Sequence, residues 1–176
     1  MTPASTTEPA VGAWVWASGN HVWTGTSGTL TANAIAKAKN NHRMKFCLLL
    51  ANHAGYVFQN ADEWQAAAKG WLPYFKHPQH LRISGKPLVI IFSSGNGDKD
   101  GFAKIQTLAA TAGLPGVAIA ACGSGDVQRG FTHTTHYNVV PGYAAGSESH
   151  KFSELVQAHQ RVWRGTPEQP YIPTLS

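Results

Sequence analysis

Two short apolar runs separated by a helical segment constrain the fold of this chain more than any other feature. The first run is MKFCLLLA, residues 44–51, the second is LVIIF, residues 88–92, and turn residues follow both. Short runs without polar alternation are typical of strands that are buried on both faces. The helical pattern from about Asp62 to Phe75 is long enough for a crossover connection, so the two strands should be parallel, with a right-handed connection.

The rest of the chain repeats this alternation of strands and helices. Further strands are expected near residues 12–18, 117–121, 136–140 and 170–175, and further helices near 30–39, 102–112 and 152–164. Such alternation predicts a parallel sheet with outer helices. An open doubly wound sheet fits this pattern, and so does part of a (β/α)8 barrel. A complete barrel does not fit, because it typically needs about 250 residues. A barrel arc keeps its strands in sequence order, whereas a doubly wound sheet reverses its order at a switch point.

Composition excludes several classes of protein. The hydrophobic fraction of 43% excludes wholesale disorder, and no stretch is long and apolar enough for a membrane span. The net charge is +5, but the basic residues are scattered, which argues against nucleic-acid binding. We expect Cys47 and Cys122 to be buried free thiols rather than a disulfide or part of a metal site.

The first eleven residues read as a disordered lead-in. They lack the basic and apolar segments of a secretory signal. The sequence does not define the compartment, and secretion of a longer parent protein remains one of the alternatives. A single domain is expected from residue 12 to residue 176.

Several polar or aromatic residues end predicted strands or follow them directly. In a parallel sheet such residues emerge at the carboxyl edge and face the ligand crevice. An Asn-His pair at a strand end can hydrogen-bond sugar hydroxyls, although a turn-capping Asn with a structural His is the alternative. The predicted substrate-binding residues are Asn52, His53, Trp16, Ser18, Ser93 and Tyr143.

Cofactor signals are weak. His133 and His136 are three residues apart, but no suitable third ligand is near them in sequence, so no metal site is expected. The loops GNGDKDG and GSGDVQRG are rich in glycine but match no dinucleotide or P-loop spacing. No cofactor is therefore expected.

The segments FCLLLANH and WLPYFKHPQHLRISGKPLVIIF resemble the glycoside hydrolase family 99-like proteins, also called the WbsX group. That group has roughly FCL-x-WAN, then a helix ending in YF-x-DP-x-Y, then a GKP-strand. The later stretches YNVVPGY and HQRVWRGTPEQPYIPTLS also fit, so the similarity covers roughly residues 12–176. The resemblance implies a (β/α)8 barrel that acts on glycans and is related to endo-acting α-mannosidases.

The chain also departs from that family pattern. Leu50 stands where the family has Trp, and residues 77–80 read HPQH where it has DPRY. The paired glutamates of the family lie in an Asn-Glu-Trp motif, which would follow Ser176. We therefore expect the catalytic carboxylates beyond the end of this chain.

Glycoside hydrolysis normally uses two carboxyl groups that flank the scissile bond. Asp62, Glu63 and Glu154 belong to predicted helix starts, where capping explains them. The acidic residues in loops after strands read as solvated turn residues; they are Asp98, Asp100, Asp126 and Glu148. No catalytic residue is assigned within the chain.

These features together predict an α/β fold: a partial (β/α)8 TIM-type barrel of about six parallel strands with outer helices. The predicted function is that of a segment of a glycan-active enzyme, either a glycoside hydrolase or a polysaccharide-assembly enzyme. Its partner would be a glycan or polysaccharide, with neither nucleic acid nor membrane, and the isolated chain should be inactive. The alternatives are a non-catalytic carbohydrate-binding or structural α/β domain, and a nucleotide-binding doubly wound protein.

Overall fold

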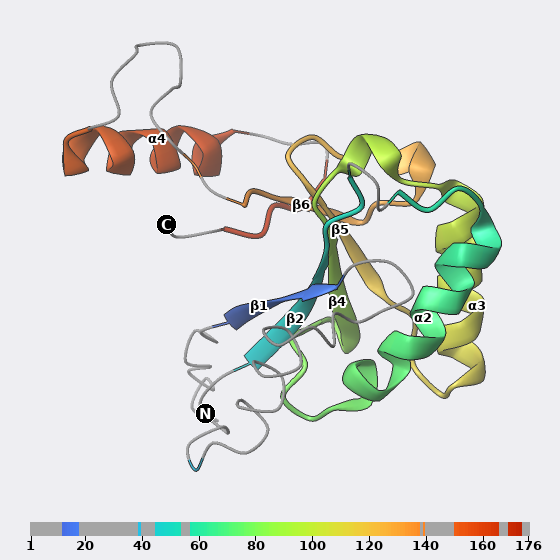
Figure 1. The fold of residues 1–176 in the computed structure, drawn as a ribbon. Helices are drawn as coiled ribbons and strands as arrows, with labels where there is room; N and C mark the ends of the chain where they lie inside the picture. The colour runs from blue at the N-terminus through green and yellow to red at the C-terminus, as the bar shows by residue number, and fades with distance from the viewer. Residues whose placement is uncertain are drawn as a thin grey trace, which may run out of the picture.

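The computed structural model describes residues 12–17, 39, 45–53, 57–137, 139, 150–165 and 169–173, with the backbone alone described for 12–17. Figure 1 shows a central sheet with two helices against one of its faces. The strands are β1 (Gly12–Ala17), β2 (Lys45–Leu50), β3 (Arg82–Ile83), β4 (Lys86–Ile91), β5 (Ala118–Cys122) and β6 (His133–Thr135). The helices are α2 (Ala61–Lys76), α3 (Lys99–Thr111) and α4 (Phe152–Arg164), with short 3-10 turns η2 (Ser94–Asn96) and η3 (Val127–Arg129).

The strand order is β1-β2-β4-β5-β6, and every neighbouring pair in that series is parallel. Tyr171 continues the series through a parallel bridge to Thr134. The order follows the sequence and has no reversal within the described sheet, which is the arrangement of a barrel arc. The predicted α/β fold, a parallel sheet with outer helices, is confirmed, and its strand order agrees with the predicted partial (β/α)8 barrel.

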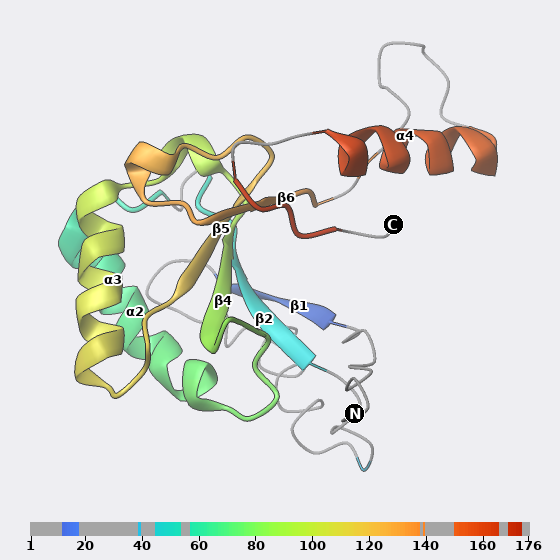
Figure 2. The same cartoon turned by 180° about the vertical axis from the view of Figure 1, so that it is seen from behind.

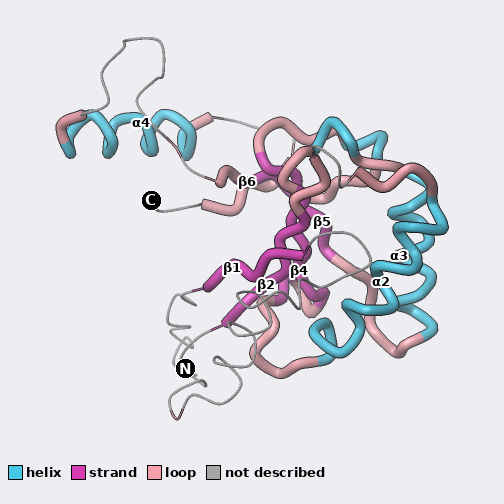
Figure 3. The backbone as a smooth tube through the Cα atoms, viewed as in Figure 1, coloured by secondary structure: helices cyan, strands magenta, loops and turns pink. Residues whose placement is uncertain are grey.

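Both faces of the sheet are buried, as the apolar runs predict. On the outer face α2 and α3 cover side chains such as Leu48, Leu50 and Ile119. On the inner face Leu49 and Ile90 belong to a second buried cluster. Figures 2 and 3 show α2 and α3 side by side, with α4 well apart from both.

The helix boundaries follow from their caps. Asn60 accepts hydrogen bonds from the backbone of the first turn of α2, and Asp98 does the same for α3. Lys104 of α3 forms an ion pair with Asp62 of α2. No described helix has the length and apolar character that a bilayer crossing requires.

Two parts of the strand prediction need correction. The sixth strand lies at residues 133–135 rather than 136–140, because Thr132 anchors it early: its Oγ1 accepts a hydrogen bond from the backbone of Ile119 at 3.1 Å. The short strand β3 was expected to be loop, yet it pairs antiparallel with β4 across a two-residue turn at Ser84 and Gly85.

The two cysteines are free, as expected. Cys47 lies within the inner cluster of the sheet, and burial raises the pKa of its thiol to about 12. Cys122 at the end of β5 is only partly buried. The predicted lead-in and the helix expected near 30–39 lie almost wholly outside the described residues.

Candidate functional site

Three of the six predicted site residues are described with their side chains. Asn52 and His53 follow β2, and Ser93 follows β4, so all three lie at the carboxyl ends of parallel strands. Trp16 lies in β1, where its backbone pairs with Leu49. Ser18 and Tyr143 lie outside the described residues.

Asn52 is fully buried and ties two loops together. Its Nδ2 donates to the carbonyl of Asn96 at 2.9 Å, and Nδ2 of Asn96 donates back to the carbonyl of Asn52 at 2.9 Å. Its Oδ1 accepts from the backbone N–H of Phe58 at 3.2 Å. Its φ of +38° lies in the left-handed region, where asparagine is enriched among non-glycine residues. These bonds hold the loops after β2 and β4 against each other. Asn52 is therefore a buried structural residue at the carboxyl edge of the sheet.

The neighbouring residue, His53, begins a row of rings along the carboxyl edge. Its ring lies 5.5 Å from that of Phe92, and the ring of Phe92 lies 5.4 Å from that of Tyr137, edge to face. Phe92 packs on the inner cluster of the sheet, so the row lies on the inner face, opposite α2 and α3. We call His53, Phe92 and Tyr137 the aromatic row; it links the ends of β2, β4 and β6.

The aromatic row passes the end of β5 at Cys122. Burial raises the pKa of the Cys122 thiol, and a hydrogen bond with the backbone of Tyr137 opposes part of that rise. A thiol held in its neutral form is a poor nucleophile. Tyr137 is 45% exposed, so a large aromatic surface at this edge is open to a ligand.

The loop after β4 is held from its other side as well. Oγ of Ser94 donates to the carbonyl of Ser124 at 2.9 Å, and the guanidinium of Arg129 donates to the carbonyl of Gly95 at 2.6 Å. Together with Asn52 these bonds fix three successive strand-end loops. Ser93, half-buried between them, follows Phe92 directly in the chain.

Sequence reasoning missed Phe92 and Tyr137. Phe92 was read as the last residue of a strand, although its spacing of two from Ile90 would have placed it on the same face as that inner residue. Tyr137 was placed inside a strand at 136–140, and only the shift of β6 to 133–135 puts it at the edge.

No protein-family model matches this chain, and no curated protein matches it either. A solved structure described as "Glycoside hydrolase-like protein" superposes with a TM-score of 0.56 at 13% sequence identity. The match covers 95% of this chain and 58% of that chain. This chain has a glycoside hydrolase-like fold. It spans little more than half the length of that neighbour.

Glycoside hydrolases normally use carboxylates for catalysis. Every described carboxylate of this chain lies at the start of a helix, either as its cap or in its first turn. Asp98 caps α3 and Asp126 caps η3, where Asp126 also pairs with Arg129. The other described acidic residues lie in the first turns of α2, α3 and α4: Asp62, Glu63, Asp100 and Glu154. Glu8, Glu148 and Glu168 lie outside the described residues. Within the described ranges, no group of three or more metal-ligating side chains gathers.

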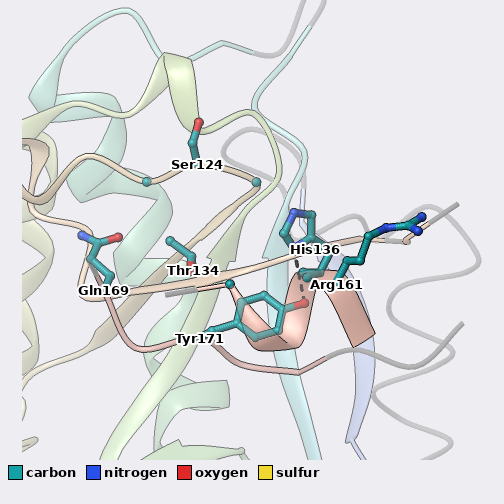
Figure 4. Close-up of a pocket in the computed structure, with 10 residues that line it drawn as sticks. Ser124, Thr134, His136, Arg161, Gln169 and Tyr171 are labelled. Carbon is teal, nitrogen blue, oxygen red and sulfur yellow. Dashed lines mark hydrogen bonds between the residues drawn. The ribbon is translucent and has the colours of Figure 1, made fainter. Parts of the chain in front are cut away.

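A cavity of about 510 Å³ lies near the ends of β5 and β6, and Figure 4 shows residues that line it. None of the three predicted site residues whose side chains are described, Asn52, His53 and Ser93, lines it. No local sequence pattern predicts this cavity, because its described lining comes from four separate segments of the chain.

Proposed function

We propose that this chain is the substrate-binding part of a glycan-active enzyme of the family 99-like type, and that the aromatic row contacts the glycan. The observation that carries the proposal is the row itself: three rings lie on the inner face, at the carboxyl edge of a sheet whose strands follow the sequence order. In barrels of this architecture the loops at that edge hold the active site.

The chemistry of the row suits a sugar. A pyranose ring has a face of C–H groups that packs against the electron-rich face of an aromatic ring. Its hydroxyl groups point outward, where the imidazole of His53 and the hydroxyl of Ser93 can exchange hydrogen bonds with them. Buried Asn52 makes no such contact in this proposal; it positions His53 by fixing the loop that carries it.

The reaction that fits is hydrolysis or transfer at a glycosidic bond. Such a step needs a proton donor and a second carboxylate across the bond, and the described carboxylates serve as helix caps instead. The described residues therefore supply binding and orientation. The likeness to a glycoside hydrolase-like protein supports a glycan as the class of substrate.

A titration with α-mannan oligosaccharides tests the proposal. Tyr137→Ala should weaken binding roughly tenfold, because it removes the exposed ring of the row. Phe152→Ala is the matched control: Phe152 is 78% exposed on α4, so it also removes an exposed ring but lies outside the row. Equal affinity of Tyr137→Ala and the parent chain would contradict the proposal, as would equal losses in both variants.

A further inference from the structure

The second feature that can hold a ligand is the cavity between the sheet and α4. Its volume of about 510 Å³ falls within the usual range of small-molecule sites, about 300–1,000 Å³. Of its ten described lining residues, six have polar side chains, three are glycines and one is Val162. The lining residues that carry the argument are Ser124, Thr134, His136, Arg161, Gln169 and Tyr171.

The cavity lies on the outer face of the sheet, opposite the aromatic row. Thr134 pairs with Ala121, which belongs to the outer cluster, and paired residues of a sheet share a face. Tyr171 bridges to Thr134 from the other side. A ligand here would therefore contact neither His53 nor Tyr137.

Gln169 gives the cavity an acceptor that lacks a partner. The residue is 5% exposed, and its Nε2 donates to the carbonyl of Phe131 at 2.7 Å. That bond fixes which end of the amide is which, and leaves Oε1 buried without a hydrogen bond in the described structure. A buried acceptor of this kind is stabilised by a donor, such as a hydroxyl group.

His136 and Tyr171 supply further polar groups. The Nδ1 of His136 lies 3.2 Å from the phenolic oxygen of Tyr171, as the dashed line in Figure 4 marks. Burial lowers the pKa of His136, so its ring is neutral at neutral pH. A neutral imidazole and a phenol can each donate or accept, which suits hydroxyl groups better than a fixed charge.

The lining is nearly free of charge. Among the described residues that line the cavity, Arg161 is the one charged residue, and Figure 4 shows its guanidinium turned away from the other labelled side chains. Gly125 lets the backbone pack closely against Gln169, because a β-carbon there would lie 2.5 Å from Oε1 of Gln169. A neutral ligand with several hydroxyl groups fits these surroundings, whereas an anion would find no inward-facing cation among the described lining residues.

The geometry points to a second carbohydrate site on the outer face, which takes one neutral sugar unit between β6 and α4. One sugar hydroxyl donates to Oε1 of Gln169, and others exchange hydrogen bonds with Tyr171 and His136. The site is separate from the aromatic row, so this inference does not depend on the function proposed above.

The test is an NMR titration of the full chain with methyl α-mannopyranoside, and with sodium sulfate as the anionic probe. The sugar should shift the signals of Gly123, Gly125 and the Gln169 amide. Tyr171→Phe should weaken that binding roughly tenfold, since it deletes one hydroxyl and keeps the ring. Tyr74→Phe, the same deletion in α2, is the matched control. Val162→Trp, which fills the cavity from α4, should abolish the shifts.

The variants separate this site from the aromatic row. Tyr137→Ala should leave the cavity shifts unchanged while it weakens binding at the row. Unshifted cavity signals at saturating sugar would overturn the inference, as would a stronger response to sulfate than to sugar. Unchanged binding in both Tyr171→Phe and Val162→Trp would also overturn it, because the shifts would then arise elsewhere.

Discussion

At the scale of single residues, His80 links stability to pH. It is fully buried, its Nε2 lies 2.9 Å from the carbonyl oxygen of Leu88, and the rings of Phe46 and Phe75 lie 5.2 Å and 5.4 Å away. Burial, more than any other cause, lowers the pKa of this imidazole from 6.5 to about 4. In the unfolded chain the same group returns to its ordinary pKa and binds a proton more readily.

The sign follows from that difference. Between about pH 6.5 and pH 4 the unfolded state holds the proton and the folded state does not, so stability falls as the pH falls through this window. The loss should total about 3 kcal/mol and level off below pH 4. Urea unfolding at a series of pH values measures it. His80→Gln should be less stable at pH 7 but should lose most of the slope; a variant with the parent's slope would assign the effect to other groups.

Asn52 and Phe92 show how far the sequence predicts the site. Both lie at the carboxyl edge, where the strand pattern placed them or their neighbours. The strand pattern does not predict that the amide of Asn52 forms hydrogen bonds with Phe58 and Asn96. Those contacts depend on two loops whose paths the sequence does not define. Its left-handed backbone is likewise set by the loop rather than by any local motif.

At the scale of elements, the contact of α2 with α3 depends on a single glycine. A β-carbon at Gly101 would lie 2.4 Å from the indole of Trp64, which is itself fully buried. Gly101→Ala should therefore destabilise the fold by roughly 1–3 kcal/mol, because either the helix or the indole must move. Thermal or urea unfolding checks the loss.

Gly70 in α2 is the matched control for Gly101. A β-carbon there would meet nothing within 4 Å, so Gly70→Ala should stabilise the fold by about 0.5–1 kcal/mol through better helix propensity. If both substitutions had the same sign, close packing at Gly101 would not be the cause of its effect.

The elements that the sequence predicted well are those with strong internal patterns. Asp62 and Glu63 at its start, and the helical pattern that runs to Phe75, define α2 before any tertiary contact is known. In contrast, β6 has only three residues, and a side-chain contact at Thr132 sets its start. Apolar residues follow β6 in the chain, and for that reason the strand was predicted at residues 136–140.

At the scale of the whole molecule, the sheet separates two surfaces with different chemistry. On the inner face, the three rings of the aromatic row lie at the carboxyl edge. The outer face carries α2 and α3 and the cavity beside α4. Strand order and direction, which the sequence does predict, bring distant residues to one edge. Which face each residue occupies depends on register, and a shift of one residue reverses it.

The same arrangement predicts the catalytic behaviour of the chain. Each described carboxylate faces a helix start, where it accepts backbone hydrogen bonds or joins an ion pair, or lies in the first turn. The aromatic row offers imidazole, phenol and hydroxyl groups, none of which replaces the pair of carboxyl groups that glycosidic cleavage normally uses. Purified chain assayed on α-mannan and on a panel of aryl glycosides should therefore bind glycan without turnover. Turnover that Asp98→Asn or Asp126→Asn abolishes, with folding intact by circular dichroism, would show that a capping carboxylate also acts as the acid or base, and that catalysis and binding share this chain.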